Sequence, residues 1–190
     1  MPDGHHVGEL CIHTEQFLLR PMAEPDVIHP CGRWFSDEVL HQHFAPGGAV
    51  DEASLRRWIA RSEQVPGWYV LAICDGHTRA PIGLMCTRVR GGTATTSLMV
   101  GETQYWGRNV AVEAHTAWRR HLYRRGIRRF QFRVSRRNRF MIDKLSRLSG
   151  LTQGPERGSW VTFVVEGGFE RPPEPQTRAL RRGSKGRNGA

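Results

Sequence analysis

The most informative part of this sequence is the stretch TSLMVGETQYWGRNVAVEA, which spans residues 96–114. Its first five residues continue a run rich in Thr that begins at Thr93 and predict the end of a strand. A loop at 101–106 follows, and a helix is expected at 107–125, because apolar residues recur there at helical spacing. The first turn of a helix has free backbone N–H groups and a partial positive charge. The stretch therefore predicts a strand, a loop and a helix start that can hold an anion.

Gly107 at this expected helix start is open to two interpretations. A glycine there lets phosphate oxygens approach the backbone closely. A glycine also fits a tight turn between a strand and a helix for steric reasons alone. One glycine does not decide between these two explanations.

The segments around this stretch predict a chain of mixed α and β structure. Val110, Ala114, Trp118 and Leu122 form one apolar helix face, and Gly126 ends that helix. The other expected elements are strands at 17–20, 68–74, 82–89, 93–100, 128–135 and 160–165, helical pieces within 25–44 broken by Pro30, and helices at 51–64, capped by Asp51, and at 139–149, closed by Gly150. The three strands between residues 68 and 100 are joined by short turns and predict an antiparallel meander.

Composition and charge exclude several classes of protein. The chain has 190 residues, with 28 Lys and Arg against 18 Asp and Glu, a formal net charge of +10. Its apolar run at 68–74 is far shorter than the ~20 residues of a membrane-spanning helix, and the first residues do not resemble a signal peptide. The four cysteines, Cys11, Cys31, Cys74 and Cys86, form no CxxC pair. We therefore expect reduced thiols in a cytoplasmic protein that does not contact membranes.

The positive charge is concentrated in two segments. Between Ala114 and Ile142 there is no Asp or Glu, yet there are ten arginines, which run from Arg119 to Arg139. The second segment, residues 171–190, is rich in Pro, Gly and Arg, and we expect it to be a disordered or partner-ordered tail. Such arginines either form a solvated surface or contact a polyanion, namely RNA, the ribosome or a phosphorylated cofactor.

The order of several groups of residues along the chain is more informative than any one group. They are Phe17-Leu18-Leu19-Arg20-Pro21 with Asp26, the meander at 68–100, Tyr105-Trp106-Gly107-Arg108 with Glu113, Phe130-Gln131-Phe132-Arg133, and Asn138 with Leu145 and Leu148 before Gly150. This order resembles the GNAT superfamily of acyl-CoA N-acyltransferases over roughly residues 15–166. Within that superfamily, the chain is most similar to the ribosomal-protein N-terminal acetyltransferases and their relatives.

The resemblance implies an α/β (α+β) fold. Its sheet would be mixed, mostly antiparallel and twisted, with about six to seven strands flanked by helices. The sheet would split between the two central strands at 93–100 and 128–135. The domain would span residues 15–170, after an N-terminal extension at 1–14 and before the basic tail at 171–190.

The resemblance also implies acetyl-CoA as the acyl donor, bound in that split. Its pantetheine arm would pair with the first strand and its pyrophosphate would lie on the loop and helix start. The residues implied in cofactor binding are Leu98, Met99, Val100, Trp106, Gly107, Arg108, Asn109, Val110, Ala111 and Asn138. Asn109 stands where the family usually has a second glycine, and Asn tolerates the left-handed region better than most residues.

The catalytic positions of the family are filled differently in this chain. The segment 93–100 has no carboxylate where many members carry a general base, and 139–148 has no Tyr where many carry an acid. The remaining candidates are Glu102 or water as a base, together with Ser135 and Asn138. Each candidate also has a structural explanation, because Glu102 can be a solvated loop carboxylate and Ser135 a hydroxyl that satisfies a strand end.

A metal site is not expected. His29-Pro30-Cys31 and His41-Gln42-His43 could supply ligands, but zinc sites usually show wider spacings within each pair. If residues 37–43 are helical, His41 and His43 point to different sides.

The sequence thus favours an enzyme that moves an acetyl group from acetyl-CoA to a primary amine. The acceptor would be a protein N-terminus, a small amine or an RNA- or ribosome-associated amine. The charge favours a ribosomal or RNA-associated acceptor, because a basic surface repels cationic small amines. The alternative is a GNAT-shaped binding module with weak or no catalysis, which docks on nucleic acid or a large assembly through its arginines and tail. Oligomeric state is left open by the sequence.

Overall fold

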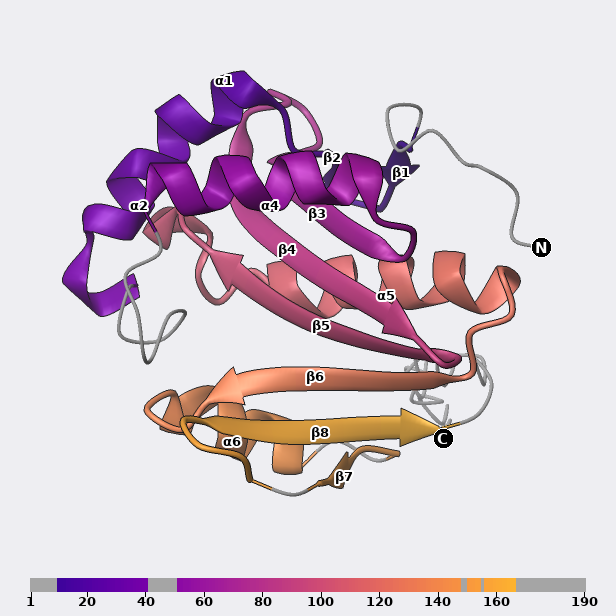
Figure 1. Ribbon diagram of the computed structural model, residues 1–190. Helices are drawn as coiled ribbons and strands as arrows, with labels where there is room; N and C mark the ends of the chain where they lie inside the picture. Colours follow the sequence, from indigo (N-terminus) through magenta and orange to yellow (C-terminus); the bar gives the residue numbers. More distant parts are fainter. Residues whose placement is uncertain (1–9, 41–50, 148–149, 155, 167–190) are drawn as a thin grey trace, which may run out of the picture.

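A single eight-stranded sheet organises the computed structural model, which describes residues 10–40, 51–147, 150–154 and 156–166 (Figure 1). The strands lie in the order β1-β2-β3-β4-β5-β6-β8-β7. Their bounds are β1 Ile12–His13, β2 Phe17–Pro21, β3 Trp68–Asp75, β4 Pro81–Arg90, β5 Thr93–Val100, β6 Arg129–Ser135, β7 Thr152–Gln153 and β8 Trp160–Glu166. The mixed, mostly antiparallel sheet is confirmed. It exceeds the expected strand number because β1 and β7 have two residues each, too few to show a periodicity.

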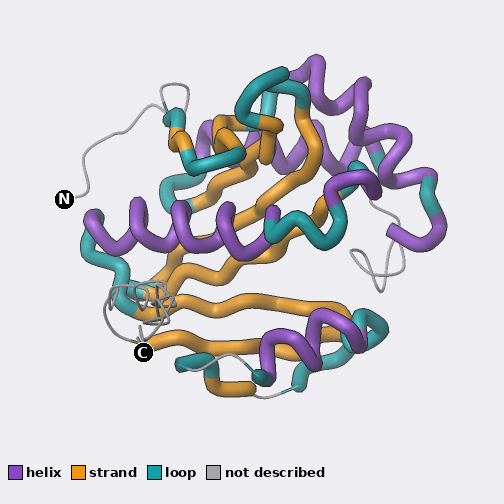
Figure 2. Tube along the Cα trace, turned by 180° about the vertical axis from the view of Figure 1, so that it is seen from behind, coloured by secondary structure: helices purple, strands orange, loops and turns teal. Residues whose placement is uncertain are grey.

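Helices cover both faces of the sheet (Figures 1 and 2). Their bounds are α1 Glu24–Asp26, α2 Gly32–Ser36, α4 Glu52–Gln64, α5 Val110–Arg124 and α6 Arg139–Ser146. The first three lie on one face, and α5 and α6 lie on the other. None of the helices in the described ranges is long and apolar enough to cross a membrane.

The alternation of side chains in the central strands divides the core in two. In β3, Leu71 and Ile73 point toward α5, while Val70 and Ala72 point toward α2 and α4. This is the period of two that a strand imposes on its side chains. Trp118 on α5 anchors its face, because its indole N–H donates to the hydroxyl oxygen of Thr87 at 2.8 Å in the buried interior.

Helix α4 forms as expected from its ends and its apolar face. The carboxylate of Asp51 accepts a hydrogen bond from the backbone N–H of Ser54 at 2.7 Å, which satisfies a free donor of the first turn. Leu55 and Ile59 are buried one turn apart, against the strands below. The helix ends at Gln64, just before Pro66.

The helical segment after β2 is interrupted where proline predicts a break. His29, the residue before Pro30, has φ −140° and ψ 125°, which is extended rather than helical. Two hydrogen bonds of 2.6 and 2.8 Å join the guanidinium of Arg20 on β2 to the carboxylate of Asp26 on α1. This partly buried pair fixes the helices to the strand next to them.

The parallel pair β5 and β6 is joined over only half of its length. Thr93 to Thr96 pair with Arg129 to Phe132, and the register includes no partner on β6 for the described residues 97–100. All of β5 nevertheless pairs with β4 on its other edge. The two central strands therefore part after Thr96, and the expected split is confirmed.

Two boundaries differ from the expectation. Helix α5 begins at Val110 rather than at Gly107, because Gly107 and Asn109 have φ +80° and +57°, which a right-handed helix cannot contain. Helix α6 ends at Ser146 within the described residues, and residues 148–149 lie outside them. His41, His43 and the tail at 171–190 also lie outside the described residues.

Candidate functional site

The parting of β5 and β6 exposes one edge of β5 at residues 97–100. Successive residues of a strand direct their N–H and C=O groups to alternate edges, so some backbone groups here have no strand to pair with. Leu98 and Val100 lie on the face toward α5 and are partly buried, whereas Met99 is buried against the other helical layer. An extended polar chain inserted here could pair with β5 as an extra strand does.

The loop after β5 presents backbone rather than side chains at the start of α5. Gly107 is left-handed, and a Cβ placed on it would meet no atom within 4 Å, so open space lies beside it. Asn109 is also left-handed, and its side chain makes no capping bond. Glu113 is the first residue to donate to a carbonyl one turn earlier, that of Asn109 at 3.0 Å, which leaves the amides of 110–112 for an external acceptor.

The charge at this helix start fits an anion such as a diphosphate. Glu113 is the acidic residue of the first turn, but its carboxylate accepts bonds from the hydroxyl of Thr14 and the backbone N–H of Gln16. Those partners lie beyond β2, on the side of β5 away from β6. The free amides of a 15-residue helix and its dipole therefore act without a carboxylate aimed at them.

Trp106 links this loop to the end of β5. Its indole N–H donates to the carbonyl oxygen of Val100 at 3.0 Å, yet the side chain is 49% exposed. The indole thus holds the loop over the open half of the strand, and much of its ring remains available to a ligand.

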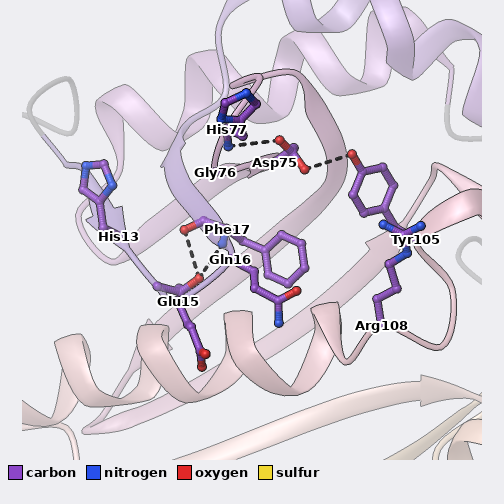
Figure 3. Close-up of a pocket in the computed structure, with 10 residues that line it drawn as sticks. His13, Glu15, Gln16, Phe17, Asp75, Gly76, His77, Tyr105 and Arg108 are labelled. Atoms are coloured by element: carbon purple, nitrogen blue, oxygen red, sulfur yellow. Dashed lines mark hydrogen bonds between the residues drawn. The ribbon is translucent and has the colours of Figure 1, made fainter.

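A cavity of about 500 Å³ adjoins the same loop on the side of β2 and β3 (Figure 3). It lies on the far side of β5 from the split. The lining residues are His13, Thr14, Glu15, Gln16, Phe17, Asp75, Gly76, His77, Tyr105 and Arg108. Arg108, which the resemblance implies in cofactor binding, lies over the ring of Tyr105 at 5.2 Å and lines this cavity.

Hydrogen bonds organise one wall of this cavity. The hydroxyl of Tyr105 donates to Asp75 at 2.9 Å, and Asp75 also accepts from the backbone N–H of His77 (Figure 3). The backbone N–H of Thr78 donates to the same carboxylate. The bond from Thr78 is the main reason why the pKa of Asp75 is lowered, while desolvation is the main reason why the pKa of Tyr105 is raised. Asp75 therefore stays ionised and Tyr105 protonated at neutral pH, which fixes the loop to the β3–β4 turn.

Glu102 is held by the opposite helical layer. Its carboxylate forms an ion pair with Arg33 and accepts the indole N–H of Trp34 at 2.9 Å, and its side chain is only 16% exposed. Trp34 also lies against Gly101, where a Cβ would overlap the indole. Glu102 is thus a fixed carboxylate at the end of β5 rather than a solvated one.

Ser135 and Asn138 lie together where β6 turns into α6. The buried hydroxyl oxygen of Ser135 accepts the backbone N–H of Arg137 at 3.3 Å. The side-chain oxygen of Asn138 accepts the N–H of Met141 at 3.0 Å and caps α6. Both side chains therefore have local structural partners, and their parts in binding or catalysis stay predictions.

His115 on α5 is a residue that the sequence did not single out. Its ring lies edge-on to Phe132 with 4.6 Å between the ring centroids, and Phe132 is the last residue of β6 that pairs with β5. The Nδ1 atom of His115 is buried without a partner among the described residues. Burial, and secondarily Arg119, lowers the pKa of His115 to about 4, so the ring is neutral at pH 7. Helical spacing places His115 beside the apolar face, but nothing in the sequence shows that the strands part next to it.

The cysteines and histidines do not form an alternative chemical centre in the described residues. All four cysteines are free, and burial raises the pKa of the Cys31 and Cys86 thiols to about 12, which keeps both protonated. No group of three or more His, Cys, Asp or Glu side chains within the described ranges is arranged to hold a metal ion.

Known structures share this architecture. An acetyltransferase of the GNAT family from Bacillus anthracis superposes with a TM-score of 0.66 at 14% identity, covering 83% of this chain and 98% of the other. An acetyltransferase from Agrobacterium tumefaciens gives 0.66 at 21% identity, covering 83% and 94%. A ribosomal-protein-S5-alanine acetyltransferase from Vibrio fischeri gives 0.64 at 11% identity, covering 86% and 100%. At these identities the likeness establishes the fold.

Comparison of the sequence with a family model identifies the family. No curated protein sequence matches the chain significantly. The family model described as the acetyltransferase (GNAT) domain, however, matches residues 16–148, which include the parted strands, the loop and the start of α5. The chain therefore belongs to the GNAT acetyltransferase family.

Proposed function

We propose that this protein is an acetyl-CoA-dependent N-acetyltransferase that acetylates the primary amine of a protein N-terminus. The observation that carries the proposal is the parting of β5 and β6 directly beside the free amides of α5. An opened strand edge suits the amide-containing pantetheine arm, and a helix start suits a diphosphate. Both features belong to the segment that the GNAT family model covers.

Residues of this chain would divide the binding of acetyl-CoA between two surfaces. The backbone of Leu98 to Val100 would pair with the pantetheine arm, and the free amides of Val110 and Ala111, close to Gly107, would hold the pyrophosphate. Bound acetyl-CoA supplies an acyl group already activated as a thioester. Trp106 would keep the loop over β5 through its bond to Val100.

The chain must then accept or pass on a proton from the attacking amine. Glu102 is the single carboxylate in residues 93–112, and it lies directly after the open half of β5. Because Arg33 and Trp34 already engage it, we propose that Glu102 acts on the amine through a water molecule rather than by direct contact. The hydroxyl of Ser135 would line the site with a polar group at the end of β6.

The acceptor class rests on charge and on one relative. The net charge of +10 disfavours small cationic amines. A structural neighbour from Vibrio fischeri is, by name, a ribosomal-protein-S5-alanine acetyltransferase. We extend that class of acceptor, the N-terminus of a ribosomal or RNA-associated protein, to this chain.

Calorimetric titration and a thiol-release assay test the proposal together. The full chain is titrated with acetyl-CoA, and release of the CoA thiol is then followed with peptides that begin with Ala, Ser or Met and with spermidine as a cationic small amine. We expect micromolar binding and turnover with at least one peptide above the rate with spermidine. Absence of acetyl-CoA binding, or turnover with spermidine alone, would contradict the proposal.

The part of Glu102 is tested by its pH dependence. Glu102→Gln keeps a hydrogen-bond acceptor for Trp34 but removes the charge. If Glu102 assists proton transfer, the variant loses the acidic limb of the pH–rate profile while its KM for acetyl-CoA changes little. A raised KM with an unaltered pH profile would show that Glu102 only positions the loop.

A further inference from the structure

The fold gathers arginines from four elements at one end of the molecule, here called the basic end. It lies where α4 and α5 finish and where β6 begins (Figure 1). Its members are Arg61 on α4, Arg88 and Arg90 on β4, Arg120, Arg124 and Arg125 at the end of α5, and Arg128 and Arg129 at the start of β6.

Strand pairing and ring contacts bring four of these arginines together in two pairs. Thr93 pairs with Arg90 on one side and with Arg129 on the other, so those two arginines flank a single strand. Arg61 and Arg88 lie over the same indole, that of Trp68, at 5.4 and 5.2 Å. Segments from α4, β4 and β6 thus meet at this end of the sheet.

Several of these guanidinium groups are held in position rather than free to rotate. Arg128 lies 4.0 Å from the ring centroid of Tyr123 and donates to the carbonyl oxygen of Tyr123 at 2.7 Å, which also satisfies the end of α5. Arg125 contacts the ring of His121 one turn earlier. A preorganised guanidinium loses less side-chain entropy when it binds an anion, so this arrangement favours recognition over simple solvation.

Three other arginines of the same run contact side chains away from the basic end. Arg119 lies over Phe130 at 5.4 Å, Arg133 lies over Trp160 at 4.6 Å, and Arg136 forms an ion pair with Glu156 at 3.0 Å. These three arginines of the run of ten therefore lie outside the basic end.

The basic end has few acidic side chains to offset it. Among the described residues, only Glu63 at the end of α4 and Glu166 at the end of β8 belong to elements that finish there. Glu166 already pairs with Arg129 at 3.1 Å. The remaining positive charge is separated from the start of α5 by the length of that helix, roughly 22 Å at 1.5 Å per residue.

We propose that the basic end is a docking surface for the phosphodiester backbone of RNA. Arginine forks match phosphate oxygens, and a cluster of them gives affinity through counterion release. Strand β8 ends at Glu166 beside Arg129, so the chain leaves the described part there, and its residues 171–190 have six basic side chains against one Glu. The choice of RNA rests on the proposed function, because an RNA-associated acceptor brings RNA with it.

Fluorescence anisotropy with a labelled 20-base-pair RNA hairpin tests the surface. The full chain is titrated at 50 and 200 mM salt. Four phosphate contacts predict a loss of affinity of roughly 150-fold between these conditions. The double variant Arg90→Gln/Arg124→Gln should weaken binding at least tenfold and reduce the slope of log Kd against log salt by about 2.

The matched control is Arg79→Gln/Arg157→Gln, which removes two exposed arginines from outside the basic end. Its RNA affinity should change less than twofold, and both variants should keep the peptide acetylation rate. Equal weakening by the two variants would show an effect of net charge alone and overturn the proposal. Salt-independent binding, or tighter binding of a DNA duplex of the same sequence, would also overturn it. If the unmodified full chain binds RNA but acetylates none of the peptides, the proposed function is rejected while the RNA-binding surface is still supported.

Discussion

The two ends of α5 meet the sheet in opposite ways. At its start, β5 has lost its partner β6, and two left-handed residues hold the loop open beside Val110. At its end, the chain passes directly into β6, whose first residues pair with both β5 and β8. One end therefore offers unpaired backbone, and the other offers fixed side chains.

The start and the end of α5 are therefore suited to two different kinds of anion recognition. The start of α5 can hold a diphosphate through amides and the helix dipole, which requires glycine and close approach. The end of α5 has carbonyl groups instead, so cations such as Arg128 stabilise it and remain able to attract phosphates. A cofactor site and a polyanion surface are thus expected at opposite ends.

The substitution with the largest expected effect is Gly107→Asp. A carboxylate placed in the open space beside Gly107 would face the pyrophosphate, so we expect the affinity for acetyl-CoA to fall more than 100-fold, about 3 kcal/mol. Gly91→Asp is the matched control, because Gly91 is also left-handed with no atom within 4 Å of a Cβ, but it lies at the other end of β5. Calorimetric titration should show normal affinity for Gly91→Asp. Equal affinity in both variants would mean that the pyrophosphate does not lie at the start of α5.

The stability of the region between the two ends should depend on pH through His115. Its pKa is lowered to about 4, so the unfolded chain takes up this proton near pH 6.5 and the folded chain does not. The free energy of unfolding should fall by about 2 kcal/mol between pH 6.5 and 4.5, which is less than the full shift implies because this pH range covers only part of the titration. The variant His115→Leu should lack this part of the decrease in urea unfolding at the two pH values. An identical pH dependence in both proteins would show that His115 is solvated and titrates normally.

The left-handed conformation at Asn109 should cost a substituted residue a smaller amount. Alanine has a Cβ atom, which disfavours the left-handed φ of +57°, and it lacks the short polar side chain that lets Asn adopt this conformation. We therefore expect Asn109→Ala to lower the free energy of unfolding by about 1 kcal/mol. Asn109→Gly should be within 0.5 kcal/mol of the parent protein. Thermal unfolding of both variants measures the difference, and equal stability of Ala and Gly would contradict the left-handed assignment.

The smallest expected effect on stability is that of removing the basic tail. Deletion of residues 172–190 removes few apolar groups, so the unfolding temperature should change by less than about 2 °C. RNA affinity should fall at the same time, since five of the basic residues are removed. A large loss of stability would show that the tail packs on the domain, which would contradict this prediction.

Local patterns in the sequence were enough to predict most elements. Asp51 caps α4 as expected, and the strand expected at 128–135 is β6. The start of α5 was predicted three residues too early, because a helical apolar pattern does not show that Gly107 and Asn109 adopt positive φ. The strands β1 and β7 were missed because two residues have no period.

The candidate site was predictable only in part for a similar reason. The family resemblance pointed to Gly107 and to the strand at 93–100, whose parting from β6 the register confirms. It did not indicate that Arg33 and Trp34 hold Glu102, nor that Tyr105 bonds to Asp75. Those contacts join residues 30 to 69 positions apart, which no local pattern encodes.

By itself, the sequence determined the helices, the strands and the excess of arginine, since propensity, capping and charge depend on residues close together in the chain. Tertiary structure alone decided where β5 leaves β6, which arginines share a surface, and which polar groups are buried without partners. Those properties depend on distances between segments remote in sequence, which are set only when the sheet is assembled and its two faces are covered.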